Sequence, residues 1–140
     1  MRVQDVTGLD GRTVVTIDPN DTIADVVYLL REHSIGAVVV SSDKKRILGI
    51  ISERDVVRHL AQEQEGTLRV PVEELMTQNV RTCQLDDDLE ATMAVMTAGH
   101  FRHMPIVTEG GDLLGIISLG DLVNARLVHL DAELKQARGE

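Results

Sequence analysis

The run Leu48-Gly49-Ile50-Ile51-Ser52 occurs a second time, unchanged, as Leu114-Gly115-Ile116-Ile117-Ser118. At the same offset, residues 14–57 align with residues 80–123 without a gap, and Asp55 aligns with Asp121. Five consecutive identities in one gap-free register indicate an internal duplication, so we expect the chain to fold as two equivalent halves. We place these halves at residues 1–65 and 66–140, with the polar segment 62–71 as the connector.

Each copy predicts the same order of elements, β-α-β-β-α. The predicted strands are residues 13–17, Ala37–Val40 and 48–51 in the first copy, and 80–83, 104–107 and 113–117 in the second. In the first copy, one helix is predicted to begin at Ile23 and a second to span Glu53–Gln62. In the second copy, the predicted helices are residues 89–98 and residues 119–137. The turn at residues 18–21 should supply the N-cap of the first helix. The residues expected to face the core are Ile23, Val26, Val27 and Leu30 in the first helix and Val56, Val57 and Leu60 in the second.

A single three-stranded unit cannot cover both faces of its own sheet. The pattern therefore predicts an α/β fold, in the broad sense that includes α+β, made of two such units. We expect them to pack as a pseudo-twofold pair with a central cleft.

The composition excludes several classes of partner. Apolar residues make up 43% of the 140 residues, but the chain has one Tyr, one Phe and no Trp, so its core must be aliphatic. The formal net charge is -9, with -3 in the first 66 residues and -6 in the rest. Nucleic acid and anionic membrane surfaces both require a basic face, so we expect neither as a partner.

Catalytic and metal chemistry also lack the residues they need. Cys83 is the single cysteine, which predicts no internal disulfide and no cysteine-based zinc site. His100 and His103 have no Glu or Cys that completes a ligand set, and neither Ser52 nor Ser118 has a histidine at motif distance. No apolar run could span a bilayer and no signal peptide is visible, so the expectation is a cytoplasmic protein without a metal and without enzymatic activity.

The duplicated motif Gly-Ile-Ile-Ser-x-x-Asp allows two interpretations. Ser52 with Asp55, and Ser118 with Asp121, have the spacing of a capping box, which satisfies backbone N–H groups at a helix start and needs no ligand. The same helix start suits a phosphate, because its N–H groups and dipole favour an anion, while the aspartate could bind ribose hydroxyls. Spacing alone favours the capping interpretation.

The paired motifs resemble those of a cystathionine-β-synthase (CBS) domain pair, also called a Bateman module. Supporting segments are Val72-Glu73-Glu74-Leu75-Met76-Thr77 and Arg102-His103-Met104-Pro105-Ile106-Val107. The resemblance covers residue 1 to about residue 128, and it is more specific for the fold than for the ligand. It implies a stand-alone regulatory module that holds an adenine nucleotide in the cleft between its domains and signals to an unknown effector protein. The ligands it implies are AMP, ADP or ATP, with NAD(H) and S-adenosylmethionine as alternatives.

The resemblance also implies particular ligand-binding residues. They are the ribose-binding Asp55 and Asp121, the phosphate-side Ser52 and Ser118, the first-strand Thr16 and Thr82, and the adenine-facing segments Gly36-Ala37-Val38 and His103-Met104-Pro105. Because both aspartates are present, the resemblance shifts the balance towards nucleotide binding. Arg54 occurs only in the first copy, and Arg102 and His103 occur only in the second. We expect these side chains to neutralise the phosphate, in one shared site or in two separate sites.

The last helix predicts self-association. Its apolar stripe extends beyond the repeat and consists of Leu119, Leu122, Val123, Leu127, Leu130 and Leu134. A homodimer is also the usual assembly of the family that the chain resembles. The alternative function is a structural or interaction dimer that binds no nucleotide and uses both motifs only as helix caps. An enzyme is the third and least favoured class.

Overall fold

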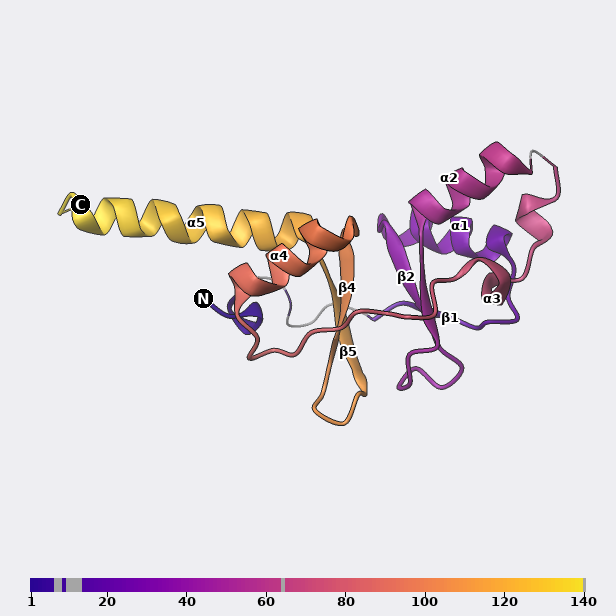
Figure 1. Cartoon of the computed structure of the whole chain (residues 1–140), viewed down its shortest axis with the longest axis horizontal. Helices are drawn as coiled ribbons and strands as arrows, with labels where there is room; N and C mark the ends of the chain where they lie inside the picture. The colour runs from indigo at the N-terminus through magenta and orange to yellow at the C-terminus, as the bar shows by residue number, and fades with distance from the viewer. Residues whose placement is uncertain (7–8, 10–13, 64, 140) are drawn as a thin grey trace.

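The computed structural model describes residues 1–6, 9, 14–63 and 65–139. In chain order its elements are η1 (Val3–Asp5), β1 (Thr16–Ile17), α1 (Ile23–His33), β2 (Ala37–Val40), β3 (Gly49–Ser52), α2 (Glu53–Gln62), η2 (Thr67–Arg69), α3 (Val72–Leu75), α4 (Leu89–Gly99), β4 (His103–Val107), β5 (Leu113–Ser118) and α5 (Leu119–Ala137). Figure 1 shows two halves side by side, one carrying β1 to β3 and the other β4 and β5. The predicted α/β pair of repeats is confirmed.

Each half is built around a small sheet. In the first, β1 pairs in parallel with β2, and β2 pairs antiparallel with β3. In the second, β4 pairs antiparallel with β5, but the predicted strand over residues 80–83 is wrong, because Cys83 alone forms a parallel bridge to Ile106. The cause lies in β4: Pro105 has no N–H and cannot donate the bond that would extend this pairing to Arg81. At the equivalent position of the first copy, Val39 keeps its N–H.

Most of the remaining boundaries move by a residue or two. Only Thr16–Ile17 of the predicted strand 13–17 forms β1, and residue 13 lies outside the described residues. The N-cap of α1 is Thr22 rather than the turn at residues 18–21, since the Thr22 N–H donates to Asp25 Oδ2 over 2.9 Å. The carboxylate of Asp21 bonds within the turn instead, where its Oδ2 accepts from the Asp18 N–H over 3.3 Å.

The leading segment of each copy packs against the other half. The Val3 N–H donates to the Asp87 carbonyl over 3.0 Å, and the Val72 N–H donates to the Asp21 carbonyl over 2.8 Å. Val3 is buried in the core of the second half, whereas Val72 is buried in the core of the first. The spatial halves therefore exchange their leading segments relative to the sequence halves at residues 1–65 and 66–140.

The core is aliphatic, as the composition predicted, with Phe101 only packed against its edge. Three predicted core positions are wrong: Val27, Val57 and Leu60 are 40%, 62% and 41% exposed. A short surface helix turns only one narrow face inward, and in α2 that face is occupied by Val56. Val57, the next residue, points away from this face, whereas Leu60 lies on the same face one turn further along, where less of it is covered.

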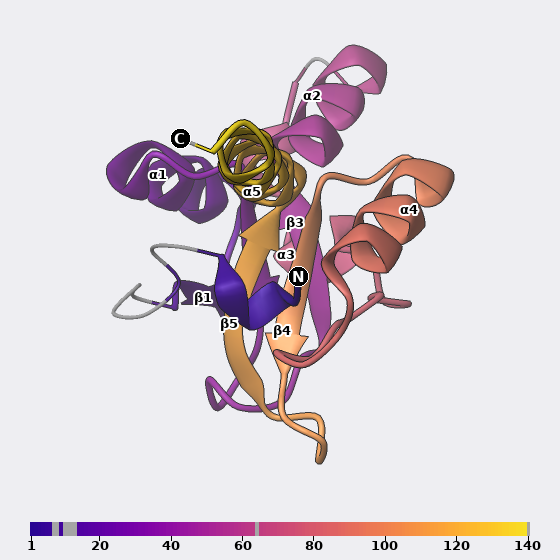
Figure 2. The ribbon, with the colours of Figure 1, turned by 90° about the vertical axis from the view of Figure 1, so that its left-hand side faces the viewer.

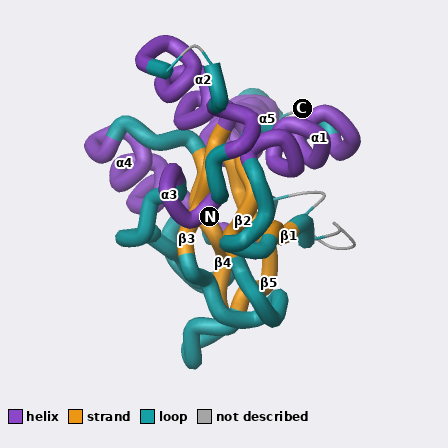
Figure 3. The backbone as a smooth tube through the Cα atoms, turned by 90° about the vertical axis from the view of Figure 1, so that its right-hand side faces the viewer, coloured by secondary structure: helices purple, strands orange, loops and turns teal. Residues whose placement is uncertain are grey.

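The four long helices gather at one end of the molecule and the hairpin turns lie at the other (Figures 2 and 3). The second half of α5 continues away from both sheets (Figure 1). Among the described residues, no helix combines the length and the apolar character needed to cross a membrane.

Candidate functional site

Both duplicated motifs form the predicted capping boxes. In the first, the Ser52 N–H donates to Asp55 Oδ2 over 2.8 Å, and the Asp55 N–H donates to Ser52 Oγ over 3.4 Å. In the second, the Ser118 N–H donates to Asp121 Oδ2 over 2.9 Å, and the Asp121 N–H donates to Ser118 Oγ over 3.0 Å. The caps fix the first turns of α2 and α5, so each serine and aspartate has a defined direction at the rim of a cleft.

The described residues form a cleft between the halves at each motif. Cleft 1, of about 350 Å³, combines Ser52 and Asp55 with the linker at residues 77–81 and the segment at residues 99–103. Cleft 2, of about 740 Å³, combines Ser118 and Asp121 with residues 33–37. Both volumes are in the range of small-molecule sites, about 300–1,000 Å³. The central cleft that the duplication predicted between the halves therefore has two parts, one at each motif.

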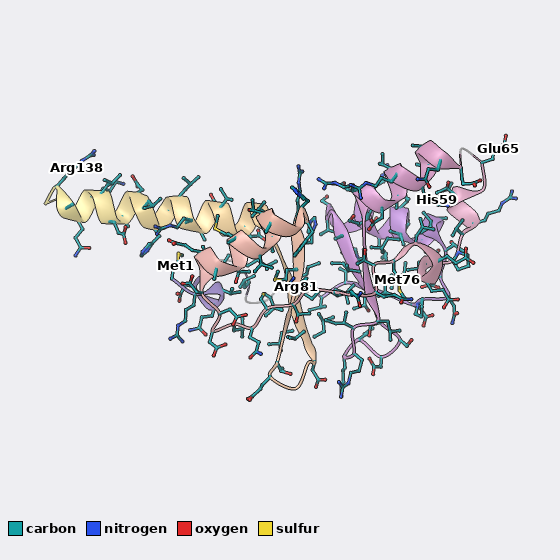
Figure 4. All side chains as sticks on the ribbon, in the orientation of Figure 1. Met1, His59, Glu65, Met76, Arg81 and Arg138 are labelled. Carbon is teal, nitrogen blue, oxygen red and sulfur yellow. The ribbon has the colours of Figure 1, made fainter. Side chains whose placement is uncertain are left out.

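Cleft 1 is basic. Arg54, Arg58, Arg81 and Arg102 line it, against two carboxylates. They come from both halves: two lie on α2, one on the linker and one before β4. Figure 4 shows Arg81 where the linker crosses between the halves. The Arg54 Nη1 donates to the His100 carbonyl over 3.3 Å, so this side chain reaches across from one half to the other.

Cleft 2 has the opposite character. Its lining is largely aliphatic and includes Ile35, Ile106 and Ile116. Asp121 is its carboxylate, and His33 and His103 are the other titratable groups among the described residues. No arginine or lysine of the described part of the chain lines it.

His103 and Gly36 lie where the two clefts meet. Both residues line both clefts. A Cβ placed on Gly36 would lie 3.0 Å from Cε1 and 3.1 Å from Nε2 of His103, so the missing side chain makes room for the imidazole. Burial lowers the pKa of His103 below its ordinary value, although the negative charges of Glu53 and Asp121 act in the opposite direction.

The clefts bring together most of the residues predicted from the sequence. Those that line a cleft are Gly36, Ala37, Ser52, Arg54, Asp55, Arg102, His103, Ser118 and Asp121. Those that line neither are Thr16, Val38, Thr82, Met104 and Pro105. Val38, Met104 and Pro105 are buried, with Val38 and Met104 in the two cores. Thr82 is exposed, and Thr77 is the linker threonine that reaches cleft 1.

Sequence reasoning missed two of the four arginines. Arg58 lies one helical turn after Arg54, so the i, i+4 spacing on the predicted helix was a usable signal. Arg81 had no such signal, because the predicted strand over residues 80–83 gave no indication of which side chain would face the cleft. The missing pairing of that segment leaves Arg81 exposed at the cleft.

Two further groups can be placed chemically. Burial, with a smaller contribution from Asp87, raises the pKa of the Cys83 thiol to about 12, so this side chain is a neutral core residue at ordinary pH. Within the described ranges, no three His, Cys, Asp or Glu side chains come together as a metal-binding group.

Comparison with known proteins agrees with the duplication. The sequence model of the CBS domain matches residues 5–62 and 72–128. A crystal structure of a CBS-domain protein from Agrobacterium tumefaciens is 40% identical with a TM-score of 0.83, covering 90% of this chain and 99% of that one. An uncharacterized 17.7 kDa protein from Acidianus ambivalens is 36% identical over 114 residues, 81% of this chain and 68% of the relative. A CBS domain protein from Pyrobaculum aerophilum, solved as a complex with AMP, is 26% identical with a TM-score of 0.80, covering 94% of this chain and 97% of that one. The chain therefore belongs to the CBS domain family and carries two of its domains in tandem.

Proposed function

We propose that cleft 1 binds an adenine nucleotide by its phosphate and that the protein is a regulatory module. The observation that carries this proposal is the gathering of four arginines in one cleft of a chain whose formal net charge is -9. A phosphate loses favourable hydration on binding, so it needs charged donors to replace the lost water. Cleft 1 concentrates those donors.

The remaining lining of cleft 1 suits a nucleoside. Asp55 stands at the rim as an acceptor for sugar hydroxyls, and Ile50, Val80 and Phe101 offer an apolar wall for a base. The AMP complex of the Pyrobaculum relative supports AMP as the first ligand to test. ADP, ATP and NAD(H) also carry anionic phosphate groups, whereas the cationic S-adenosylmethionine suits the arginines least.

A regulatory output requires that the nucleotide has different affinities for two states of the protein. Both halves contribute to cleft 1, so a ligand there would favour one relative position of the halves. We propose that an effector protein reads this position. The absence of any catalytic role for the clefts is part of the same proposal.

The direct test is calorimetry with AMP and adenosine on three proteins: wild type, Arg81→Ala and Arg138→Ala. Arg138 is a matched control, because it lies at the far end of α5 from cleft 1 (Figure 4). We expect Arg81→Ala to weaken AMP about 10-fold, to change adenosine little, and Arg138→Ala to resemble wild type. Equal loss of AMP in both variants, or no AMP binding by the wild type, contradicts the proposal.

A structural dimer without a nucleotide remains the second candidate, because both motifs do form capping boxes. The protein's own ultraviolet absorbance separates the two candidates. With one Tyr and no Trp, the chain absorbs weakly at 280 nm, so co-purified adenine would dominate the spectrum near 260 nm. A protein that shows no such peak, and no thermal stabilisation by AMP, ADP, ATP or NADH, favours the structural candidate.

We also propose that α5 pairs with α5 of a second copy of the chain. Val123, Leu127, Leu130 and Leu134 are exposed on the helix at the 4-3-4 spacing of a coiled-coil seam. Arg126 forms an ion pair with Glu90 of its own chain over 2.8 Å, and in an antiparallel pair we expect it to lie near Glu133 of the other copy as well.

Light scattering at micromolar concentration tests this pairing. We expect a dimer for the wild type and for Leu68→Glu, whose leucine is half exposed on η2, and a monomer for Leu127→Glu. A monomeric wild type, or a dimer that survives Leu127→Glu, would exclude the α5 pairing.

A further inference from the structure

His103 is the titratable side chain that the two clefts share among the described residues. It opens β4, between the motif of cleft 1 on one side and the motif of cleft 2 on the other. Its ring occupies the space left by Gly36, and the Glu53 carboxylate also approaches that space, with Oε1 3.5 Å from the position of a Cβ on Gly36. The imidazole is therefore confined at the boundary between the clefts.

The charged groups around the ring come from both clefts. Glu53 at the start of α2 belongs to cleft 1, and Asp121 in the first turn of α5 belongs to cleft 2. Arg102 precedes His103 in the chain and opposes its protonation. The other charged groups of cleft 1 are Arg54, Asp55, Arg58 and Arg81, and cleft 2 adds His33 as a titratable neighbour. Burial is the largest influence and keeps the ring neutral to a lower pH than usual.

A phosphate in cleft 1 would reverse this balance. A doubly negative group beside an imidazole favours the protonated form and supplies an acceptor for its N–H. Binding would then take up a proton from solvent at near-neutral pH. Because the same ring faces cleft 2, the positive charge it gains would stand beside Asp121.

We propose that His103 couples the two clefts, by taking up a proton when a phosphate enters cleft 1 and presenting the resulting charge to cleft 2. This inference rests on nucleotide binding in cleft 1. Coupling of this kind is reciprocal, so a change of charge in cleft 2 must alter phosphate affinity in cleft 1. Linkage also sets the pH dependence: the contribution of His103 to phosphate affinity rises as the pH falls through the pKa of His103 in the complex, and levels off below its lower pKa in the free protein. The phosphate itself takes up a proton at about pH 6, so this contribution is the difference between wild type and His103→Asn.

The chain has five histidines, so their imidazole proton resonances can be followed individually by nuclear magnetic resonance. His100 lines cleft 1 alone, His33 lines cleft 2 alone and His103 lines both. The His103 signal is assigned by its loss in His103→Asn. We expect AMP to raise the pKa of His103 by about 1, and adenosine to leave it unchanged.

The reciprocal experiment changes a charge in cleft 2 and measures AMP affinity in cleft 1. We expect Asp121→Asn to weaken AMP about 2- to 3-fold near pH 6.5, as followed by the His100 resonance, because the ring loses a neighbouring negative charge. The same change made in a His103→Asn background should have no effect, and Asp112→Asn, a carboxylate in the β4–β5 turn, should resemble wild type.

The two possible failures are distinguishable. If AMP moves the His100 resonance while the pKa of His103 stays constant, the coupling is wrong and nucleotide binding in cleft 1 stands. An effect of Asp121→Asn that persists in the His103→Asn background also overturns the coupling. If AMP moves no cleft resonance and gives no thermal stabilisation, the proposed function fails and the coupling fails with it.

Discussion

Clefts 1 and 2 descend from one duplicated sequence and differ most in charge. Each cation of cleft 1 has an uncharged counterpart at the equivalent position of the other copy. Arg54 and Arg58 correspond to Gly120 and Asn124, while Arg81 and Arg102 correspond to Val15 and Gly36. The capping residues Ser52 and Asp55, in contrast, are repeated as Ser118 and Asp121.

The difference separates what the fold requires from what a ligand requires. A capping box stabilises any helix that starts at the end of a strand, so both copies keep it. Cations confined beside one another repel, and they are tolerable where an anion binds between them. Among the described residues these arginines line one cleft only, which supports the proposal that a phosphate binds in cleft 1.

Removing two of the cleft 1 cations together should have the largest effect. We expect Arg54→Ala/Arg102→Ala to weaken AMP about 100-fold, since each charged hydrogen bond contributes on the order of 1.5–3 kcal/mol. Adenosine should lose less than about 3-fold, because it has no phosphate. Calorimetry on both ligands measures the difference. Equal losses for AMP and adenosine would show that the arginines do not act on the phosphate.

The second comparison removes the aspartate of each motif in turn. Asp55→Ala and Asp121→Ala each remove a carboxylate from a capping box, so both should lower the free energy of unfolding by about 1 kcal/mol. Only Asp55 lines cleft 1, so Asp55→Ala should weaken AMP about 10-fold, well beyond the smaller indirect effect at Asp121. Denaturant unfolding and calorimetry measure the two quantities separately. The same AMP loss in both variants would mean that the clefts are not distinct.

More of the fold than of the candidate site could be predicted from the sequence. A gap-free repeat and two helix-start motifs were enough to predict the element order, because caps and apolar periodicity are local properties. The prediction of a strand at residues 80–83 was wrong for a non-local reason, because Pro105 on the neighbouring strand has no N–H to donate. The predicted burial of Val57 and Leu60 was wrong because periodicity indicates an apolar face but not how much of that face other elements cover.

The site depended on tertiary contacts that local patterns do not contain. Arg81 and Arg102 belong to the second copy, yet they line the cleft that carries the motif of the first. The shared position of His103 arises because Gly36, from the other half, leaves space for its ring. The family resemblance implied an adenine-facing role for the segments of Gly36 and His103 separately, and the contact between these two residues became visible only in the folded chain.

Adding a methyl group at Gly36 tests the boundary between the clefts. Because a Cβ there would lie 3.0 Å from the His103 ring, Gly36→Ala must displace that ring. We expect a loss of about 1 kcal/mol in the free energy of unfolding and a shift of the His103 resonance, with phosphate affinity reduced about 3-fold. Gly110→Ala, in the β4–β5 turn, is the control, since a Cβ there meets its nearest atom at 3.8 Å. An unmoved His103 resonance in Gly36→Ala would show that the ring is not held by this contact.

The smallest expected effect is the pH dependence of stability that His103 brings to the ligand-free protein. Its pKa is lowered in the folded chain, so the unfolded chain binds the proton more readily. The contribution of His103 is therefore fully present above its unfolded pKa of about 6.5, and it is lost as the pH falls towards the lower folded value.

Denaturant unfolding at pH 7.5 and pH 5.5 measures this loss, which should stay below about 1 kcal/mol because the ring is only partly buried. His103→Asn should lose less stability than wild type between these pH values. AMP should reduce the loss in the wild type, since its phosphate favours the protonated ring, but not in His103→Asn. An identical pH dependence in the wild type and in His103→Asn would mean that His103 titrates alike in the folded and the unfolded chain.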